Sequence, residues 1–153
     1  MIIKIKERAK KPKKKKPKSI ARLVDDCAVL LQKLVRLKAS RDDFGLIRCV
    51  TCGVYRKWNE MQGGHFIERG KRSTKLVEEN CHPQCPGCNM YRMKTTSGVL
   101  AYRRYMVGMY GEELVKELER LSKQPKKYTR SEIEELSAEF KRQIKIQEER
   151  LGI

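Results

Sequence analysis

The first long amphipathic pattern of the chain covers residues 20–39. Its apolar side chains recur every three or four positions, which places them on one face of a helix. Ser19 stands where a helix N-cap is expected. The stripe consists of Ile20, Leu23, Val24, Cys27, Leu30, Leu31, Leu34 and Leu37. We predict a helix whose apolar face packs within the same chain, with pairing to a second copy as the alternative.

The last third of the chain carries three more helical patterns. Residues 99–110 and 112–122 are each amphipathic, and Gly111 between them is a typical helix C-terminal residue. Thr129 and Glu132 form a capping box that opens a last helix. The apolar stripe of that helix is Ile133, Leu136, Phe140, Ile144 and Leu151. We predict a structural region that packs on the rest of the chain or supports self-association.

The middle of the chain shows only short patterns. Residues 46–50 and 55–61 are typical of short strands. Gly63 and Gly64 allow a close backbone approach or a turn that bulkier residues would resist. A helix is expected to begin near Cys88 or Asn89 and to run through Met93, before residues 95–98 break it.

Together these patterns predict an α+β fold that is mainly α, in which a small cysteine-bounded module is flanked by amphipathic helices. We divide the chain into a disordered basic arm at 1–18, an N-terminal helix at 19–43, the module at 44–98 and a C-terminal helical region at 99–153.

The charge of the chain favours a polyanionic partner. There are 36 Lys and Arg against 19 Asp and Glu, a formal net charge of +17. The excess lies in residues 1–18 and 44–110, whereas residues 111–153 are balanced. Nucleic acid is the first candidate, since no apolar run approaches membrane-spanning length. No secretory signal is visible, so we expect a cytoplasmic protein that keeps its cysteines reduced.

Two basic regions are candidate DNA contacts. Residues 4–18 form a low-complexity tail with two prolines, which we interpret as an arm that binds the DNA backbone through Lys13, Lys14, Lys15 and Lys16. A merely solubilising tail is the alternative. Around the module the candidate phosphate contacts are Arg69, Lys71 and Arg72, in a loop at 68–75, and Arg92 and Lys94. A solvated basic face would have the same composition.

Two Cys-x-x-Cys pairs bound the module. Cys49 and Cys52 form the first pair, and Cys85 and Cys88 form the second. Two thiolate pairs at this spacing are typical of a tetrahedral structural zinc site. Cys81 is a competing ligand, because it stands four residues before Cys85.

Inside the cysteine pairs, three residues suit phosphodiester hydrolysis. That reaction needs a base for water, a cation that offsets phosphate charge, and a means of holding the phosphate. His65 could serve as the base, and Asn89 as a ligand of catalytic Mg²⁺, with Mn²⁺ as an alternative. Asn80 could order the loop that keeps the histidine oriented.

The ordered set of His65, Asn80 and Asn89 within paired cysteines resembles the HNH, or ββα-metal, nucleases. Within that superfamily the chain is most similar to the NinG/Rap recombination proteins of lambdoid phages, from about residue 20 to near the C-terminus. The layout is also similar to endonuclease VII-type resolvases. The matching stretches are Leu34-Val-Arg-Leu-Lys38, Cys49-Val-Thr-Cys-Gly53, Gly64-His-Phe66, Asn80-Cys-His-Pro-Gln-Cys85, Cys88-Asn89, Ala101-Tyr-Arg103 and Gly111-Glu-Glu-Leu-Val-Lys-Glu-Leu118.

The resemblance implies a zinc-stapled ββα module and a Mg²⁺-dependent endonuclease that hydrolyses branched recombination intermediates, such as Holliday junctions or D-loops. It also implies the roles of zinc ligand, base, loop anchor and Mg²⁺ ligand given above. Paired cutting of a junction would require a homodimer, and a phage recombinase is a candidate partner.

Two positions depart from the expected pattern. Many HNH sites have an acidic residue or a histidine before the base, as a second metal ligand, whereas this chain has Gly64. The missing ligand could come from His82, from Glu68, or from a phosphate oxygen and water. A structural role for His82 is an equal alternative. Val99 follows Ser97 and Gly98 where the family pattern has Asn, with no consequence that we can derive.

Two other functions remain open on the sequence alone. The Gly64 departure allows a non-catalytic zinc module that binds branched DNA or recruits a recombinase. A nuclease that cuts one duplex sequence is the third reading, but no dedicated recognition element is visible.

Overall fold

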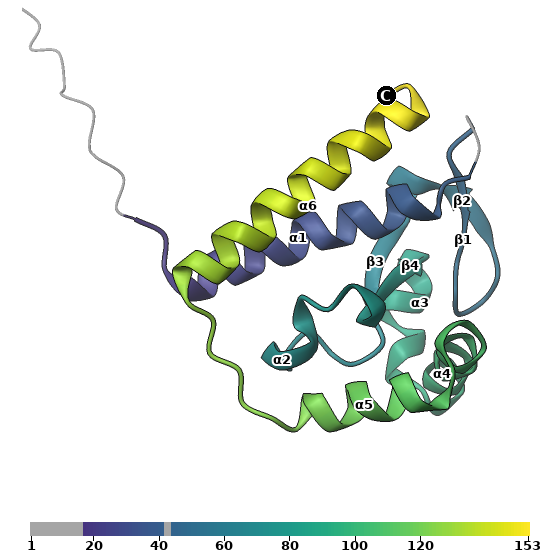
Figure 1. The fold of residues 1–153 in the computed structure, drawn as a ribbon. Coiled ribbons are helices and arrows are strands. Elements are labelled where there is room, and N and C mark those ends of the chain that lie inside the picture. Colours follow the sequence, from purple (N-terminus) through teal and green to yellow (C-terminus); the bar gives the residue numbers. More distant parts are fainter. Residues whose placement is uncertain (1–16, 42–43) are drawn as a thin grey trace, which may run out of the picture.

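The computed structural model describes residues 17–41 and 44–153 (Figure 1). Lys13, Lys14, Lys15 and Lys16 lie outside these residues, so the DNA-binding arm stays a prediction. The described elements are α1 (Ile20–Ala39), β1 (Leu46–Arg48), β2 (Tyr55–Lys57), η1 (Trp58–Glu60), β3 (Gln62–His65), α2 (Arg72–Lys75), η2 (Glu78–Asn80), β4 (Cys81–Gln84), α3 (Pro86–Met90), η3 (Arg92–Lys94), α4 (Thr96–Tyr110), α5 (Glu112–Ser122) and α6 (Arg130–Leu151). The predicted class, α+β and mainly α, is confirmed.

Helices α1 and α6 form a parallel pair at one side of the molecule (Figure 1). Arg130 near the start of α6 donates to the carbonyl of Lys18 at 2.7 Å, and Arg150 near its end donates to the carbonyls of Leu37 and Ser40. Buried side chains of both predicted stripes share one core. The intramolecular packing predicted for the first stripe is therefore confirmed.

The predicted helix caps are also present. The Ser19 side chain accepts a hydrogen bond from the backbone N–H of Arg22 at 3.2 Å. Thr129 and Glu132 make both hydrogen bonds of the capping box at the start of α6. Such caps satisfy backbone donors that have no partner within the helix. The predicted limits of α1 and α5 agree with the structure.

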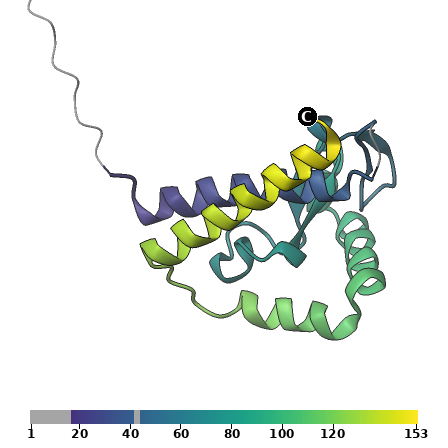
Figure 2. The ribbon, with the colours of Figure 1, turned by 45° about the horizontal axis from the view of Figure 1, so that its top comes forward.

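Two small antiparallel sheets lie in the described part of the chain. Strands β1 and β2 pair across the turn that carries the first two cysteines. Strands β3 and β4 form a hairpin in which Gly64 is opposite His82 and His65 is opposite Cys81. Helix α3 follows β4 directly, so the order β3, β4, α3 gives the predicted ββα arrangement. The hairpin lies between the α1–α6 pair and the α4–α5 pair (Figure 2).

Several predicted boundaries differ from those in the structure. Of the predicted helix break at residues 95–98, only Thr95 is extended: its side chain accepts from the N–H of Gly98 at 3.2 Å and starts α4 at Thr96. Helix α3 begins at Pro86, a residue that suits the first position of a helix. The loop predicted at 68–75 ends in the single turn of α2. The second predicted strand ends at Lys57 and continues as η1.

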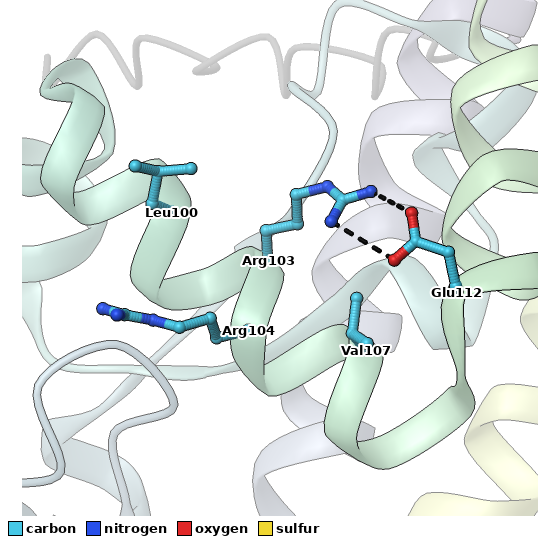
Figure 3. A pocket seen from close by; sticks show the side chains of 5 residues that line it. All are labelled: Leu100, Arg103, Arg104, Val107 and Glu112. Carbon is cyan, nitrogen blue, oxygen red and sulfur yellow. Dashed lines mark hydrogen bonds and ion pairs between the residues drawn. The ribbon is translucent and has the colours of Figure 1, made fainter.

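An arginine on α4 fastens α5 at the corner between the two helices. A cavity of about 310 Å³ opens there, and Figure 3 shows Arg103 turned towards Glu112, with Arg104 turned away. Arg103 makes two hydrogen bonds to the Glu112 carboxylate. The Arg103 guanidinium therefore joins α4 to α5. Within the described residues, no helix has the length and apolar character needed to cross a membrane.

Candidate functional site

Four cysteine sulfurs converge where the β1–β2 turn meets the start of α3. The ligand atoms of Cys49, Cys52, Cys85 and Cys88 all lie within 4.8 Å of one another, and the sulfurs of Cys52 and Cys85 are 3.8 Å apart. A tetrahedral zinc with Zn–S bonds of about 2.3 Å requires sulfurs about 3.8 Å apart. The four residues could therefore hold a metal ion such as zinc, as predicted.

The surroundings of the cluster favour a thiolate at Cys49. Burial opposes the charged form, but backbone hydrogen bonds from Cys52, Cys85 and Thr51 outweigh burial and lower the pKa of Cys49 to about 7. Burial and the neighbouring sulfurs raise the pKa of Cys88. Thiols that bind a cation release their protons, so metal binding at this cluster depends on pH.

Cys81 is not part of this cluster. Its side chain is fully buried in the core between the hairpin, α1 and α6. Burial raises the pKa of the Cys81 thiol to about 12. The structure therefore favours the Cys85 and Cys88 pair over the competing pairing of Cys81 with Cys85.

His65 ends strand β3 on the face of the hairpin that packs against α1. Only 6 % of the residue is exposed, and burial lowers the pKa of its imidazole to about 4. Its Nε2 is 2.9 Å from the carbonyl oxygen of Lys75. A neutral ring next to a carbonyl must carry its proton on that nitrogen. Nδ1 is therefore a proton acceptor, and it is buried with no hydrogen-bond partner.

Asn80 holds the segment that supplies this carbonyl. Its Nδ2 donates to the carbonyl oxygens of Ile67 and Thr74, and its Oδ1 accepts from the N–H of Ile67 at 2.8 Å. These hydrogen bonds hold both ends of the segment between β3 and α2. Thr74, at the second end, is the residue before Lys75. These contacts match the loop-ordering role expected of Asn80, whereas its part in catalysis stays a prediction.

The face of the hairpin opposite His65 carries side-chain amides. Asn89 on α3 donates from Nδ2 to Gln62 Oε1 at 2.7 Å. Gln84 is fully buried and donates from Nε2 to Thr51 Oγ1 at 2.6 Å. A β-carbon built on Gly64 would meet the side-chain oxygens of both Gln84 and Asn89. The lack of a side chain at Gly64 therefore lets these two oxygens approach the backbone of the hairpin.

The predicted base and the predicted cation ligand thus lie on opposite faces of one strand. Successive residues of a strand point to opposite faces. Gly64 borders Asn89, and His65 is the next residue along the chain. The two groups share a short piece of backbone, and their action on one phosphodiester stays a prediction.

His82 is occupied by tyrosines. The Tyr102 hydroxyl donates to the carbonyl of Gly64 at 2.9 Å, so it must accept from Nδ1–H of His82, 3.0 Å away. The other nitrogen, Nε2, then accepts from the Tyr110 hydroxyl at 2.8 Å. Burial lowers the pKa of His82 to about 4. Because both nitrogens have partners, these contacts favour the structural role for His82 over metal binding.

The five phosphate contacts predicted around the module are at the surface. Arg69, Lys71 and Arg72 precede or begin α2, and Arg92 and Lys94 form the ends of η3. The positive charge of Arg69 contributes to the lowered pKa of His65, which indicates that its guanidinium lies near the imidazole. Glu68, a candidate metal ligand, is exposed and 3.9 Å from Lys71.

Sequence reasoning missed a groove and an amide pair. Arg41, Arg48, Tyr55 and Tyr105 are among the residues that line a groove of about 370 Å³ beside the β1–β2 turn. Cationic and aromatic side chains together are typical of surfaces that bind nucleic acid. Gln62 and Gln84 carry no motif, and only a glutamine directly before Cys85 could have drawn attention to the second.

The stretches that carry the family resemblance are in contact in the folded chain. Tyr102 joins the Gly64 backbone to His82, and Arg103 joins α4 to Glu112. Among known proteins, the family described as Bacteriophage Lambda NinG protein matches residues 3–150. No curated protein and no solved structure matches the chain. A match over nearly the whole length assigns the family, and the chain therefore belongs to the NinG family.

Proposed function

We propose that the chain is a Mg²⁺-dependent DNA endonuclease that cuts branched intermediates, such as Holliday junctions or D-loops, in phage recombination. Its membership of the NinG family links it to phage recombination. The observation that carries the nuclease proposal is the buried, unpartnered Nδ1 of His65. A lowered pKa keeps that nitrogen free of a proton at neutral pH, as a general base requires.

The other residues of the module supply the remaining functions. Asn80 and the Lys75 carbonyl hold the imidazole in one tautomer and one orientation. Asn89 Oδ1 would be a ligand of Mg²⁺. When bound, Mg²⁺ would offset negative charge on the phosphate and the leaving oxygen. The four cysteines would hold a structural zinc that fixes the start of α3 against the β1–β2 turn.

Charge and shape support DNA as the substrate. The net charge of +17 favours a polyanion. The groove that contains Arg41, Arg48 and Tyr55 offers cations and an exposed ring beside the cysteine cluster. Such contacts address the backbone and unpaired bases and carry little sequence information, as expected for an enzyme that recognises branches. Symmetric cuts across a junction would need two copies of the chain.

A four-way junction assay tests the proposal. The zinc-loaded protein is incubated with the junction and Mg²⁺, beside His65→Ala and His82→Gln variants, and both incision and binding are measured. We expect incision to fall by about a hundredfold or more in His65→Ala, as for loss of a general base, while junction binding persists. His82→Gln, if folded by circular dichroism, keeps its incision because the tyrosine cluster has no part in the chemistry.

Burial of His65 Nδ1 favours a second candidate, a zinc module that binds branched DNA without cutting it. That function predicts junction binding without incision in the unaltered protein and in both variants. Incision that survives His65→Ala unchanged would contradict His65 as the base.

A further inference from the structure

An unsatisfied oxygen lies on the amide face of the hairpin. The Gln84 side chain is fully buried, and its Nε2 is held by Thr51. Its Oε1 is buried and has no hydrogen-bond partner. Burying a carbonyl oxygen without a partner is unfavourable, so such an atom is expected to meet a donor or a cation in the working molecule.

A second oxygen faces the same place. The hydrogen bond from Asn89 Nδ2 to Gln62 Oε1 fixes the amide so that its Oδ1 is turned towards Gly64. A β-carbon on Gly64 would be 1.8 Å from Gln84 Oε1 and 3.0 Å from Asn89 Oδ1. The two oxygens are therefore no farther apart than the sum of these distances. Oxygen ligands of one Mg²⁺ are about 3 to 4 Å apart, and this upper limit on the separation allows such a spacing.

We propose that Gln84 Oε1 and Asn89 Oδ1 form a divalent cation site, in which Gln84 supplies the ligand that Gly64 lacks. This inference rests on the proposed nuclease function and adds a residue to its site. Side-chain oxygens favour a hard ion such as Mg²⁺ or Mn²⁺ over the zinc that suits the four cysteines. Gln62 is a positioning residue, because it orients Asn89 through Nδ2.

Glycine at position 64 is a condition of this arrangement. Any side chain there would collide with the Gln84 amide. The ligand therefore comes from β4, across the hairpin, and not from β3. Two neutral amides bind a cation weakly, so phosphate oxygens and waters must complete its shell. Cation and phosphate then strengthen each other's binding.

Paramagnetic broadening by Mn²⁺ tests the site directly, without any cleavage. Side-chain amide NMR signals of the zinc-loaded protein are followed during a millimolar Mn²⁺ titration. We expect the signals of Gln84, Asn89 and Gln62 to broaden first, and excess Mg²⁺ to restore them. Gln32 is the matched control, because it packs against Gly63 on the other face of the same hairpin.

Substitutions at Gln84 distinguish a metal ligand from a side chain that only fills space in the core. Gln84→Leu should weaken Mn²⁺ binding about tenfold or more, as losses at metal sites commonly do. Gln84→Glu keeps the oxygen, adds a charge and should tighten binding. Gln32→Leu should leave Mn²⁺ binding unchanged. Unchanged binding in Gln84→Leu, or weaker binding in Gln84→Glu, would overturn the proposal.

Moving the ligand to the other strand provides a further test. Gly64→Asp alone should destabilise the protein, since its β-carbon meets the Gln84 oxygen. Gly64→Asp combined with Gln84→Gly removes that collision and should bind Mn²⁺ at least as tightly as the unaltered chain. A double variant that folds but does not bind Mn²⁺ would contradict the site.

The outcomes distinguish this inference from the nuclease proposal. If Asn89→Ala loses Mn²⁺ binding and Gln84→Leu keeps it, Gln84 is not a ligand. The nuclease proposal is unaffected by that result. Broadening at Gln84 together with no junction incision supports the cation site and contradicts the enzyme. No broadening at Gln84 and Asn89 overturns the inference, and incision of junctions with Mg²⁺ would then show that the enzyme uses other ligands.

Discussion

The two histidines of the chain lie on opposite faces of one hairpin and differ in their partners. His65 and His82 are equally buried, at 6 % exposed, and burial lowers the pKa of each to about 4. Both nitrogens of His82 are hydrogen-bonded to tyrosines, whereas His65 keeps one nitrogen unpartnered. Burial and pKa are therefore poor guides to function here, and hydrogen-bond satisfaction separates the structural ring from the candidate base.

Removing the metal should have the largest effect, because one ion bound by the four cysteines would join the β1–β2 turn to the start of α3. Structural zinc contributes about 10 kcal/mol or more to small domains. We expect a chelator, or Cys88→Ser, to unfold the hairpin and α3 and to return the pKa of both histidines towards 6.5. Thermal unfolding by circular dichroism and histidine NMR titration measure this. Cys27→Ser, at a buried thiol outside the cluster, is the control.

Acid should have the next largest effect, and both histidines contribute to it. Their folded pKa of about 4 lies below the unfolded value of 6.5, so the unfolded chain takes up protons that the folded chain refuses. Their contribution is complete above pH 6.5 and is lost between about pH 6.5 and 4. At about 1.4 kcal/mol per pKa unit, the two shifts together account for about 7 kcal/mol.

Denaturant unfolding across that pH range tests this expectation. His65→Gln and His82→Gln should each remove about half of the slope, and comparison between variants cancels the contribution of the cysteines. Equal slopes in all three proteins would contradict the buried, neutral state of both rings.

Two substitutions should each destabilise one face of the hairpin, the first beside His65 and the second beside His82. Asn80→Ala removes three hydrogen bonds made by a fully buried side chain and should cost about 3 kcal/mol. Tyr102→Phe leaves the Gly64 carbonyl and His82 Nδ1–H unpaired and should cost about 2 kcal/mol. Denaturant unfolding gives both costs.

The histidine NMR signals then sharpen the comparison. Asn80→Ala should move the His65 signals and leave those of His82, and Tyr102→Phe should do the reverse. Tyr110→Phe, at a partly exposed residue that gives His82 one hydrogen bond, should cost less than Tyr102→Phe. Movement of both histidines in every variant would mean that the faces are not independent.

The sequence by itself determined the features that depend on neighbours along the chain. Apolar spacing and the Ser19 and Thr129 caps fixed α1 and α6, and the spacing of the cysteine pairs fixed the metal cluster. These features are local, since a helix period, a cap or a Cys-x-x-Cys turn involves residues within one or two turns. The ordered set of His65, Asn80 and Asn89 spans a longer stretch and was recognised through the family resemblance.

Only the tertiary structure decided which groups meet across the hairpin. The register pairs Gly64 with His82, and this places Gln84 and Asn89 on one face and His65 on the other. Helix α4 then gives His82 its tyrosine partners, from residues 20 and 28 positions away. A strand shifted by one residue would exchange the two faces, and no local pattern in the sequence specifies that choice. The unpartnered atoms of His65 and Gln84 therefore became visible only once the chain was folded.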